Sequence, residues 1–163
     1  MNILEAFRRA RLRREFSKHV PPELMSAMGG TARVRRTQPR HFQYILVHIR
    51  EADIDEIPSL ITKVVDAFLC RNAIVTDIAT SLIVGYFGIP IAKYDSAEAR
   101  SQLVAALLAE NGNAVRVAHG ECNGLAGNFG SDRRWSYGAI IPNFSAVLKK
   151  LLDLEFGTAV EIW

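Results

Sequence analysis

The chain has 163 residues, of which 49% are hydrophobic and 23% charged, and its net charge is +3. This length fits one domain plus an extension, and the apolar content is ample for one core. No run of 18 or more apolar residues occurs and the first residues are rich in arginine, so we expect neither a membrane span nor a secretory signal. Cys70 and Cys122 form no metal-binding pattern, and we expect structural thiols in a reduced, cytoplasmic setting.

The charge is distributed unevenly along the chain. Residues 1–40 contain ten Lys and Arg residues against three Glu, a net charge of +7, whereas the rest carries ten basic and fourteen acidic residues, a net charge of −4. A basic segment before an acidic body is typical of an interaction segment. We therefore divide the chain into a basic helical extension and linker, residues 1–40, and a domain, residues 41–163.

The extension is predicted to begin with a helix over residues 1–20, which Pro21 and Pro22 end. Its apolar residues form two offset stripes, the first of Ile3, Phe7 and Ala10 and the second of Leu12, Phe16 and Val20. Arginines occupy the other faces of this helix. Three interpretations stay open: the helix docks on its own domain or a twin, lies on an anionic membrane surface, or contacts nucleic acid. Docking is favoured because the other two roles rarely need two offset apolar stripes. A short helix and a basic linker to Arg40 are expected to follow.

The first half of the domain predicts a strand, a helix and a hairpin. Residues 42–49 are almost continuously apolar, which favours a central strand. Asp55 is expected to cap a helix in which Pro58 lies in the first turn and apolar residues recur up to Phe68. Residues 73–90 then predict two apolar strands joined at a polar bend and ended by glycine and proline.

The second half predicts two more helices and three strands. Ser96 or Asp95 is expected to cap a helix that ends at Asn111-Gly112, and its inward residues are Leu103, Val104, Leu107 and Leu108. A strand over 114–120, a glycine-rich loop over 123–132 and a strand over 135–141 follow. Pro142 opens a third helix, and residues 159–163 form the last strand. The complete order predicts an α+β domain with a ferredoxin-like βαββαβ core, an added strand-helix-strand, and a preceding N-terminal helix.

Four stretches of the domain carry a resemblance to a known family. They are FSKHVPPEL (16–24), AIVTDIATSLIVGYFGIP (73–90), residues 95–108, and VRVAHGECNGLAGNFGSDRRWSYG (115–138). In order and spacing they resemble the domain start, central hairpin, helix and strand-turn segment of class III adenylate and guanylate cyclase catalytic domains. The resemblance implies the nucleotidyl cyclase fold from about residue 14 onward, and it implies a dimer in which each active site lies between two domains.

The residues at the family's metal-binding positions differ from the family pattern. The resemblance implies that two aspartates hold two metal ions, which lower the pKa of the attacking ribose hydroxyl and hold the triphosphate. The first aspartate corresponds to His48 and the second, at the hairpin turn, to Ser81. Neither is a carboxylate, and histidine is a poor Mg²⁺ ligand. A histidine in an apolar strand is more typical of a core residue with its hydrogen bonds satisfied.

The remaining family positions differ as well. The base-reading lysine corresponds to Asp77 and its partner to Pro142. The asparagine that orients the ribose corresponds to Ser145, and the transition-state arginine to Lys149, which keeps the charge but loses the bidentate fork. These correspondences predict that no catalytic position is intact, and we expect no cofactor.

The predicted function is therefore that of a catalytically inactive, cyclase-like regulatory or dimerisation domain in signalling. Arg134, Trp135 and Tyr137 resemble residues near the family's dimer face. We expect a homodimer, or a hetero-partner such as another cyclase domain, in the cytoplasm or peripherally at a membrane. The basic arm is expected to contact a protein or an anionic surface rather than nucleic acid. The alternative is residual nucleotide binding, or weak cyclase activity with substituted metal ligands.

Overall fold

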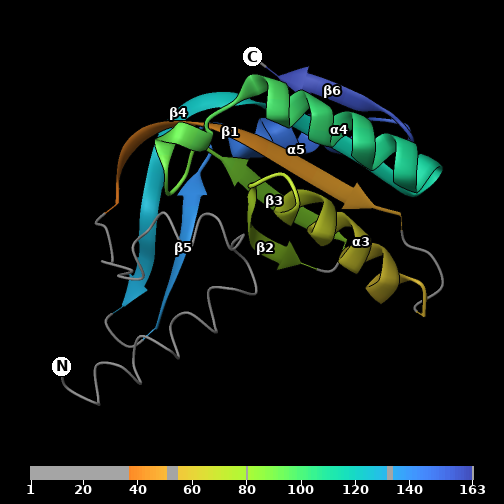
Figure 1. The fold of residues 1–163 in the computed structure, drawn as a ribbon, viewed down its shortest axis with the longest axis horizontal. Helices are drawn as coiled ribbons and strands as arrows, with labels where there is room; N and C mark the ends of the chain where they lie inside the picture. The colour runs from red at the N-terminus through yellow and green to blue at the C-terminus, as the bar shows by residue number, and fades with distance from the viewer. Residues whose placement is uncertain (1–36, 51–54, 80, 132–133, 163) are drawn as a thin grey trace.

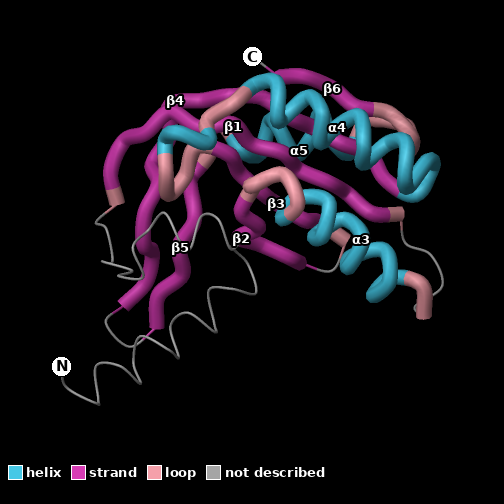
Figure 2. Tube along the Cα trace, viewed as in Figure 1, coloured by secondary structure: helices cyan, strands magenta, loops and turns pink. Residues whose placement is uncertain are grey.

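A computed structural model describes residues 37–50, 55–79, 81–131 and 134–162, with the backbone alone at residues 128, 130, 131 and 134–137. Within these ranges the chain is an α+β fold of one six-stranded sheet and three α-helices (Figure 1, Figure 2). The elements in chain order are β1 (Gln38–Ile49), α3 (Ile57–Leu69), β2 (Ile74–Ala79), β3 (Leu82–Phe87), the 3-10 helix η1 (Ala92–Tyr94), α4 (Ala97–Asn111), η2 (Gly112–Ala114), β4 (Val115–Ser131), β5 (Arg134–Ile140), α5 (Phe144–Leu152) and β6 (Ala159–Ile162).

The sheet places β1 at its centre. Its strand order is β2-β3-β1-β4-β5, all neighbours are antiparallel, and β6 adds to β4 in parallel. The predicted order of strands and helices along the domain is therefore confirmed, while the predicted N-terminal helix and the sequence motif at 16–24 lie outside the described residues. Figure 1 shows that β4 and β5 project together beyond the helices. None of the described helices is long and apolar enough to cross a membrane.

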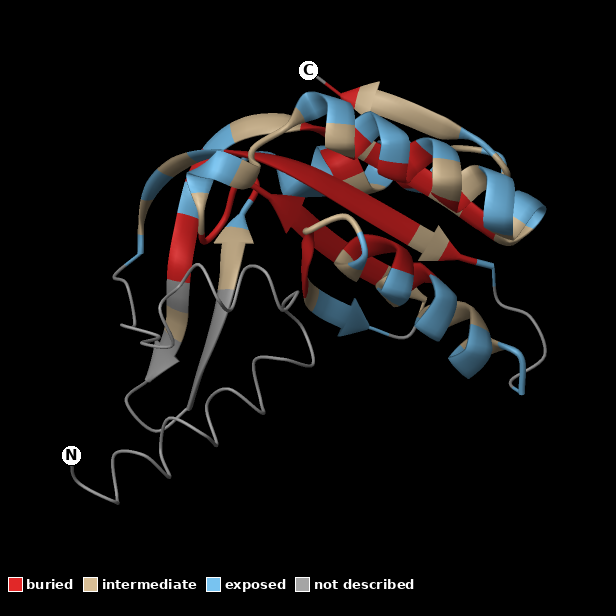
Figure 3. Ribbon diagram, in the orientation of Figure 1, coloured by how far each residue is buried: buried red, intermediate tan, exposed pale blue. Residues whose placement is uncertain are grey.

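Two hydrophobic cores lie on opposite faces of the sheet. Figure 3 shows that the central strands between them are largely buried. The side chains of β1 alternate between the two cores, because successive residues of a strand point to opposite faces. Ile45 and Val47 pack with α3 and α4, whereas Tyr44 and Leu46 pack on the α5 side with Leu151. This alternation places His48 on the α5 face of the sheet, next to the end of β1.

Two predicted boundaries around the projecting hairpin are wrong. β1 begins at Gln38, so Arg40, which we had assigned to the linker, pairs with Gly124 of β4. The predicted glycine-rich loop over 123–132 is instead the second half of β4, which runs to Ser131. Gly124 serves close packing rather than a turn, since a Cβ there would lie 2.8 Å from the ring of Phe42 and would also meet the carbonyl oxygen of Ile140.

The helix ends follow the sequence in part. Ser96 caps α4 as predicted, accepting a hydrogen bond from the backbone of Ala99 at 3.1 Å. The predicted cap at Asp55 is wrong, because the residue before α3 is Glu56 and it makes no side-chain capping bond. α5 begins at Phe144 rather than at Pro142, after Asn143 adopts a left-handed conformation with φ of 55°. The remaining elements lie within about two residues of their predicted bounds.

Candidate functional site

The fold brings together the two residues at the family's metal positions. His48 lies near the end of β1, and Ser81 lies at the bend between β2 and β3, next to it in the sheet. The Ser81 hydroxyl oxygen is 3.3 Å from Nε2 of His48, and the Ser81 carbonyl accepts a hydrogen bond from the backbone of Ile49 at 2.7 Å. The structure therefore brings the two residues together, which the sequence alone could not show. Their correspondence to metal-binding positions stays a prediction.

A third residue, Arg116 of β4, completes the site and was missed. Its Nε donates a hydrogen bond to Nδ1 of His48 at 3.1 Å. Its Nη1 donates to the carbonyl oxygens of Leu152 and Leu154 at 2.6 and 2.8 Å, so the guanidinium also ties the end of α5 to the sheet. One signal could have revealed it: Arg116 occupies an apolar position of the family pattern hIGIHxG, and a strand otherwise apolar rarely carries an arginine there without a partner.

The hydrogen bond from Arg116 fixes the proton on the His48 ring. A guanidinium has donors only, so Nδ1 of His48 must accept, and the neutral ring then carries its proton on Nε2. Nε2 is therefore able to donate to the Ser81 hydroxyl, whose own proton can turn to another acceptor. We call Arg116, His48 and Ser81 the arginine-histidine-serine cluster.

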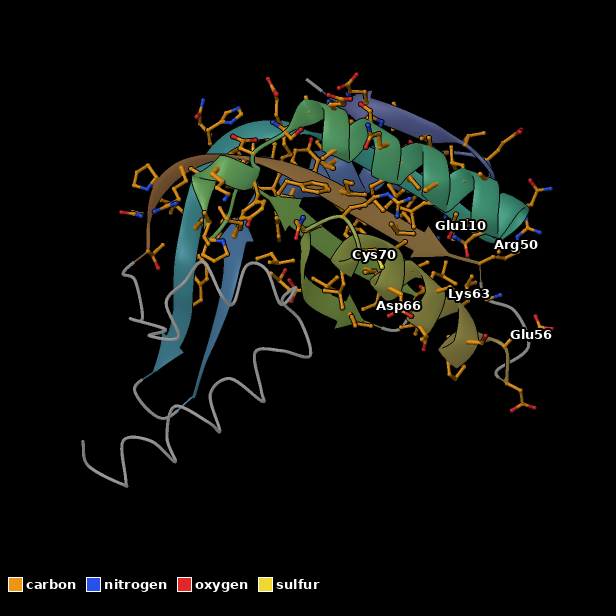
Figure 4. The ribbon with its side chains drawn as sticks, in the orientation of Figure 1. Arg50, Glu56, Lys63, Asp66, Cys70 and Glu110 are labelled. Carbon is orange, nitrogen blue, oxygen red and sulfur yellow. The ribbon has the colours of Figure 1, made fainter. Side chains whose placement is uncertain are left out.

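The ring of Phe156 lies beside the cluster, and a second cation, Arg50, contacts the same ring. Phe156 lies 5.7 Å from the His48 ring, centroid to centroid, and the guanidinium carbons of Arg116 and Arg50 each lie 4.6 Å from the centre of the Phe156 ring. Figure 4 places Arg50 at the end of β1, and its backbone donates to the carbonyl of Ala114 at 2.8 Å. Cation–π contacts of this kind favour guanidinium groups against an aromatic face. The site therefore carries two positive charges.

The donor set of this site is poorly suited to a divalent cation. Mg²⁺ and Mn²⁺ prefer carboxylate, carbonyl and water oxygens, whereas the cluster presents N–H donors, one hydroxyl and two guanidinium groups. Within the part of the chain that the structure describes, no group of three or more His, Cys, Asp or Glu side chains is placed to hold a metal ion.

The other family positions lie apart from the cluster. Asp77 is exposed on β2, where it accepts a hydrogen bond from the Thr76 hydroxyl at 2.9 Å. Pro142, Ser145 and Lys149 are all exposed at the start and along the outer side of α5. Among the described residues, no hydrogen bond or ion pair joins these four to the cluster. These four residues therefore lie on the surface, apart from the cluster.

The predicted interface residues lie on the projecting hairpin. Arg134, Trp135 and Tyr137 belong to β5, and their backbones pair with residues 131, 130 and 128 of β4. The structure describes no side chain at these positions. Their role at a dimer face therefore stays a prediction.

A separate polar network lies on the opposite face of the sheet. Arg100 of α4 is buried and donates from Nη1 to Gln43 at 2.7 Å and from Nη2 to Glu161. Gln43 in turn donates to Asp95 at 2.9 Å and to Glu121 at 3.2 Å.

His119 lies on this same face, beside the polar network. Its burial and the nearby Arg100 lower its pKa, which Glu161 partly offsets. Its Nδ1 has no hydrogen-bond partner among the described residues.

The comparison with solved structures identifies the fold. The guanylyl cyclase Cya2 matches with a TM-score of 0.65 at 15% sequence identity, over 76% of this chain and 75% of that chain. The adenylyl cyclase CyaB from P. aeruginosa matches with a TM-score of 0.64 at 18% identity, over 78% and 79%. A bacterial light-regulated adenylyl cyclase matches with a TM-score of 0.67 at 10% identity, over 92% of this chain and 50% of that chain.

These likenesses confirm the resemblance found in the sequence at the level of fold. The chain has the curled sheet and helices of a class III adenylyl or guanylyl cyclase catalytic domain. No protein-family model matches the sequence, and no curated protein matches it. At such low identities the likeness defines the architecture, and the activity must be argued from the residues of the site.

Proposed function

We propose that this chain is a cyclase-homology domain that has lost catalysis and regulates signalling by association with another domain. The observation that carries the proposal is the arginine-histidine-serine cluster at the family's metal positions. The cluster does more than lack two carboxylates: its polar atoms already bond to one another, and Arg116 holds the His48 nitrogen that could otherwise bind a metal.

A divalent cation at this place would meet three obstacles. Nδ1 of His48 would have to release its hydrogen bond from Arg116, and Nε2 would have to lose its proton. The cation would also lie near the guanidinium groups of Arg116 and Arg50, whose positive charge repels it. We infer that two-metal activation of a ribose hydroxyl, which the family uses, is not available to these residues.

The remaining positions support the same proposal. Lys149 carries a positive charge but cannot form the two-pronged contact of an arginine, and Pro142 has no side-chain hydrogen bonding. In a mixed dimer with an active cyclase, one site would have metals but an impaired transition-state clamp, and the other would lack metal carboxylates. Losing one such contact typically costs on the order of 10²–10³ in rate. The chain would then act as an inhibitor by sequestration.

Light scattering tests whether the domain associates at all. The second candidate is a homodimeric scaffold, which follows from the family's two-domain architecture. A symmetric dimer of the 18.1 kDa chain should have a measured mass of about 36 kDa at micromolar concentration. Titration into an active class III cyclase tests the regulatory role, and its rate should fall as this chain is added. Stimulation of that cyclase would contradict the proposal. So would a chain that is monomeric throughout and forms no complex with the cyclase.

The alternative, residual nucleotide binding, has its own signature. If substituted ligands still held a metal and a nucleotide, ATP or GTP would bind more tightly with Mn²⁺ than with a chelator present. Calorimetry in both conditions separates this outcome from the proposal, which expects no metal-dependent affinity.

A further inference from the structure

An apolar stripe crosses three strands on the face of the sheet that α3 and α4 cover elsewhere. Pro39 of β1 pairs with Leu125 of β4, and Leu125 pairs with Ile140 of β5. Directly paired residues of antiparallel strands point to the same face, and Ala126, next to Leu125, is buried on the opposite face. The three side chains therefore lie side by side, and we call them the hairpin stripe.

The hairpin stripe is exposed. Leu125 is 41% and Ile140 51% exposed, and Pro39 is exposed as well. Figure 1 shows why: β4 and β5 project beyond the helices, so neither α3 nor α4 reaches this part of the sheet. Single exposed apolar residues are ordinary on protein surfaces, but a contiguous row across three strands marks a contact surface.

Acidic groups lie further along the same face, beyond the paired residues His41 and Asn123. Glu121 lies four residues before Leu125 on β4, is half-buried, and accepts a hydrogen bond only from Gln43 among the described residues. Asp95 accepts from the same Gln43 and pairs with His41 at 2.6 Å. A partner that offers apolar side chains together with positive charge would complement this surface.

The chain itself supplies such a partner. Residues 1–36 precede β1 and join the described chain at Thr37, two residues before Pro39 of the stripe. Residues 1–20 carry apolar residues at helical spacing, Phe7 and Phe16 among them, together with several arginines. The 16 residues of 21–36 can span up to roughly 50 Å when extended, so they do not restrict the return of the arm.

We propose that residues 1–20 dock as an amphipathic helix on the hairpin stripe of the same chain, with their arginines beside Glu121 and Asp95. Tethering favours this occupant over a separate molecule, because a short linker gives an effective concentration in the millimolar range. The inference does not depend on the loss of catalysis, since it uses none of the residues of the arginine-histidine-serine cluster. It places the arm on the hairpin that carries the predicted dimer-face residues.

Hydrogen exchange followed by mass spectrometry on the full chain tests the proposal. Amides of residues 1–20 should exchange slowly, and the double substitution Leu125→Ser with Ile140→Ser should speed their exchange about tenfold or more. The matched control is Ile78→Ser, at a residue 44% exposed on β2 at the far edge of the sheet, which should leave the arm unchanged. Glu121→Lys should speed arm exchange to a smaller degree.

A second double variant tests the same contact from the arm, so that its result does not depend on correct folding of an altered hairpin. Phe7→Ser with Phe16→Ser alters the arm and none of the described residues, and it should speed the exchange of amides of β4 and β5 around the stripe. An arm that exchanges at the rate of an unstructured chain in the parent protein would overturn the proposal. So would protection that appears only at concentrations where the mass doubles, which would identify a second copy, or only with anionic phospholipid vesicles, which would identify a membrane.

Discussion

Truncation of Arg116 should destabilise the domain far more than loss of an ordinary surface charge. Arg116→Ala removes three hydrogen bonds, to His48 and to the carbonyls of Leu152 and Leu154, and one cation–π contact with Phe156. At about 1 kcal/mol net for each hydrogen bond and about 0.5–1 kcal/mol for the stacking, the loss is roughly 3.5–4 kcal/mol. The larger part should come from the two helix-end carbonyls, which lose their partner.

Thermal and urea unfolding, followed by circular dichroism, measure this effect. The expected fall in Tm is roughly 5–15 °C for a domain of this size. Arg116→Lys should recover only part of it, because an ammonium group cannot direct donors to three acceptors at once. Lys150→Ala is the matched control: it removes a positive charge from the same end of α5 and should cost about 0.5 kcal/mol or less. If Arg116→Ala costs no more than Lys150→Ala, the cluster does not tie α5 to the sheet.

Two further substitutions test the packing and the buried histidine. Gly85→Ala should lower the free energy of unfolding in urea by about 1–3 kcal/mol, because the added Cβ would collide with the Phe68 ring. Gly138→Ala is the control and should be nearly neutral, because the nearest neighbour of its Cβ would lie at 3.9 Å. Equal losses for the two variants would refute this account. Burial and the nearby Arg100 lower the pKa of His119, so the unfolded chain binds this proton more readily than the folded one. The contribution of His119 to stability should therefore be fully present above pH 6.5, the ordinary pKa of histidine, and should be lost as the pH drops through the folded pKa. His119→Gln should reduce this loss of stability at low pH. An unchanged dependence of stability on pH in that variant would contradict the reasoning.

The order of elements could be predicted because apolar periodicity survives in a single sequence. The continuous apolar run of β1 and the capping serine of α4 each have one local cause that the sequence displays. The start of β1 was missed because Gln38 and Arg40 are polar and Pro39 is rare within a strand. These residues are in a strand because the distant half of β4 pairs with them. Glycines in β4 were taken for a loop, although Gly124 is required by the ring of Phe42.

The contacts of the site could not be predicted from the sequence. Comparison with the family pattern singled out His48 and Ser81, and the structure shows that the Ser81 hydroxyl lies 3.3 Å from Nε2 of His48. That these residues replace metal ligands stays a prediction. The bond between Arg116 and His48 joins residues 68 positions apart. An arginine in an apolar strand indicates that a partner is needed, but it does not indicate which residue provides it. Phe156 joins the site because the segment between α5 and β6 passes beside Arg50 at the end of β1.

The most direct test of the central claim is a cyclase assay on the purified full chain. The chain is incubated separately with ATP and GTP in the presence of Mn²⁺, and cyclic nucleotide is measured against a buffer blank, with an active class III cyclase as the positive control. Because His48 and Ser81 bond within a cationic cluster, we predict no cyclic AMP or cyclic GMP above the blank. Product that rises in proportion to the amount of this protein, and disappears with a chelator, would contradict the account.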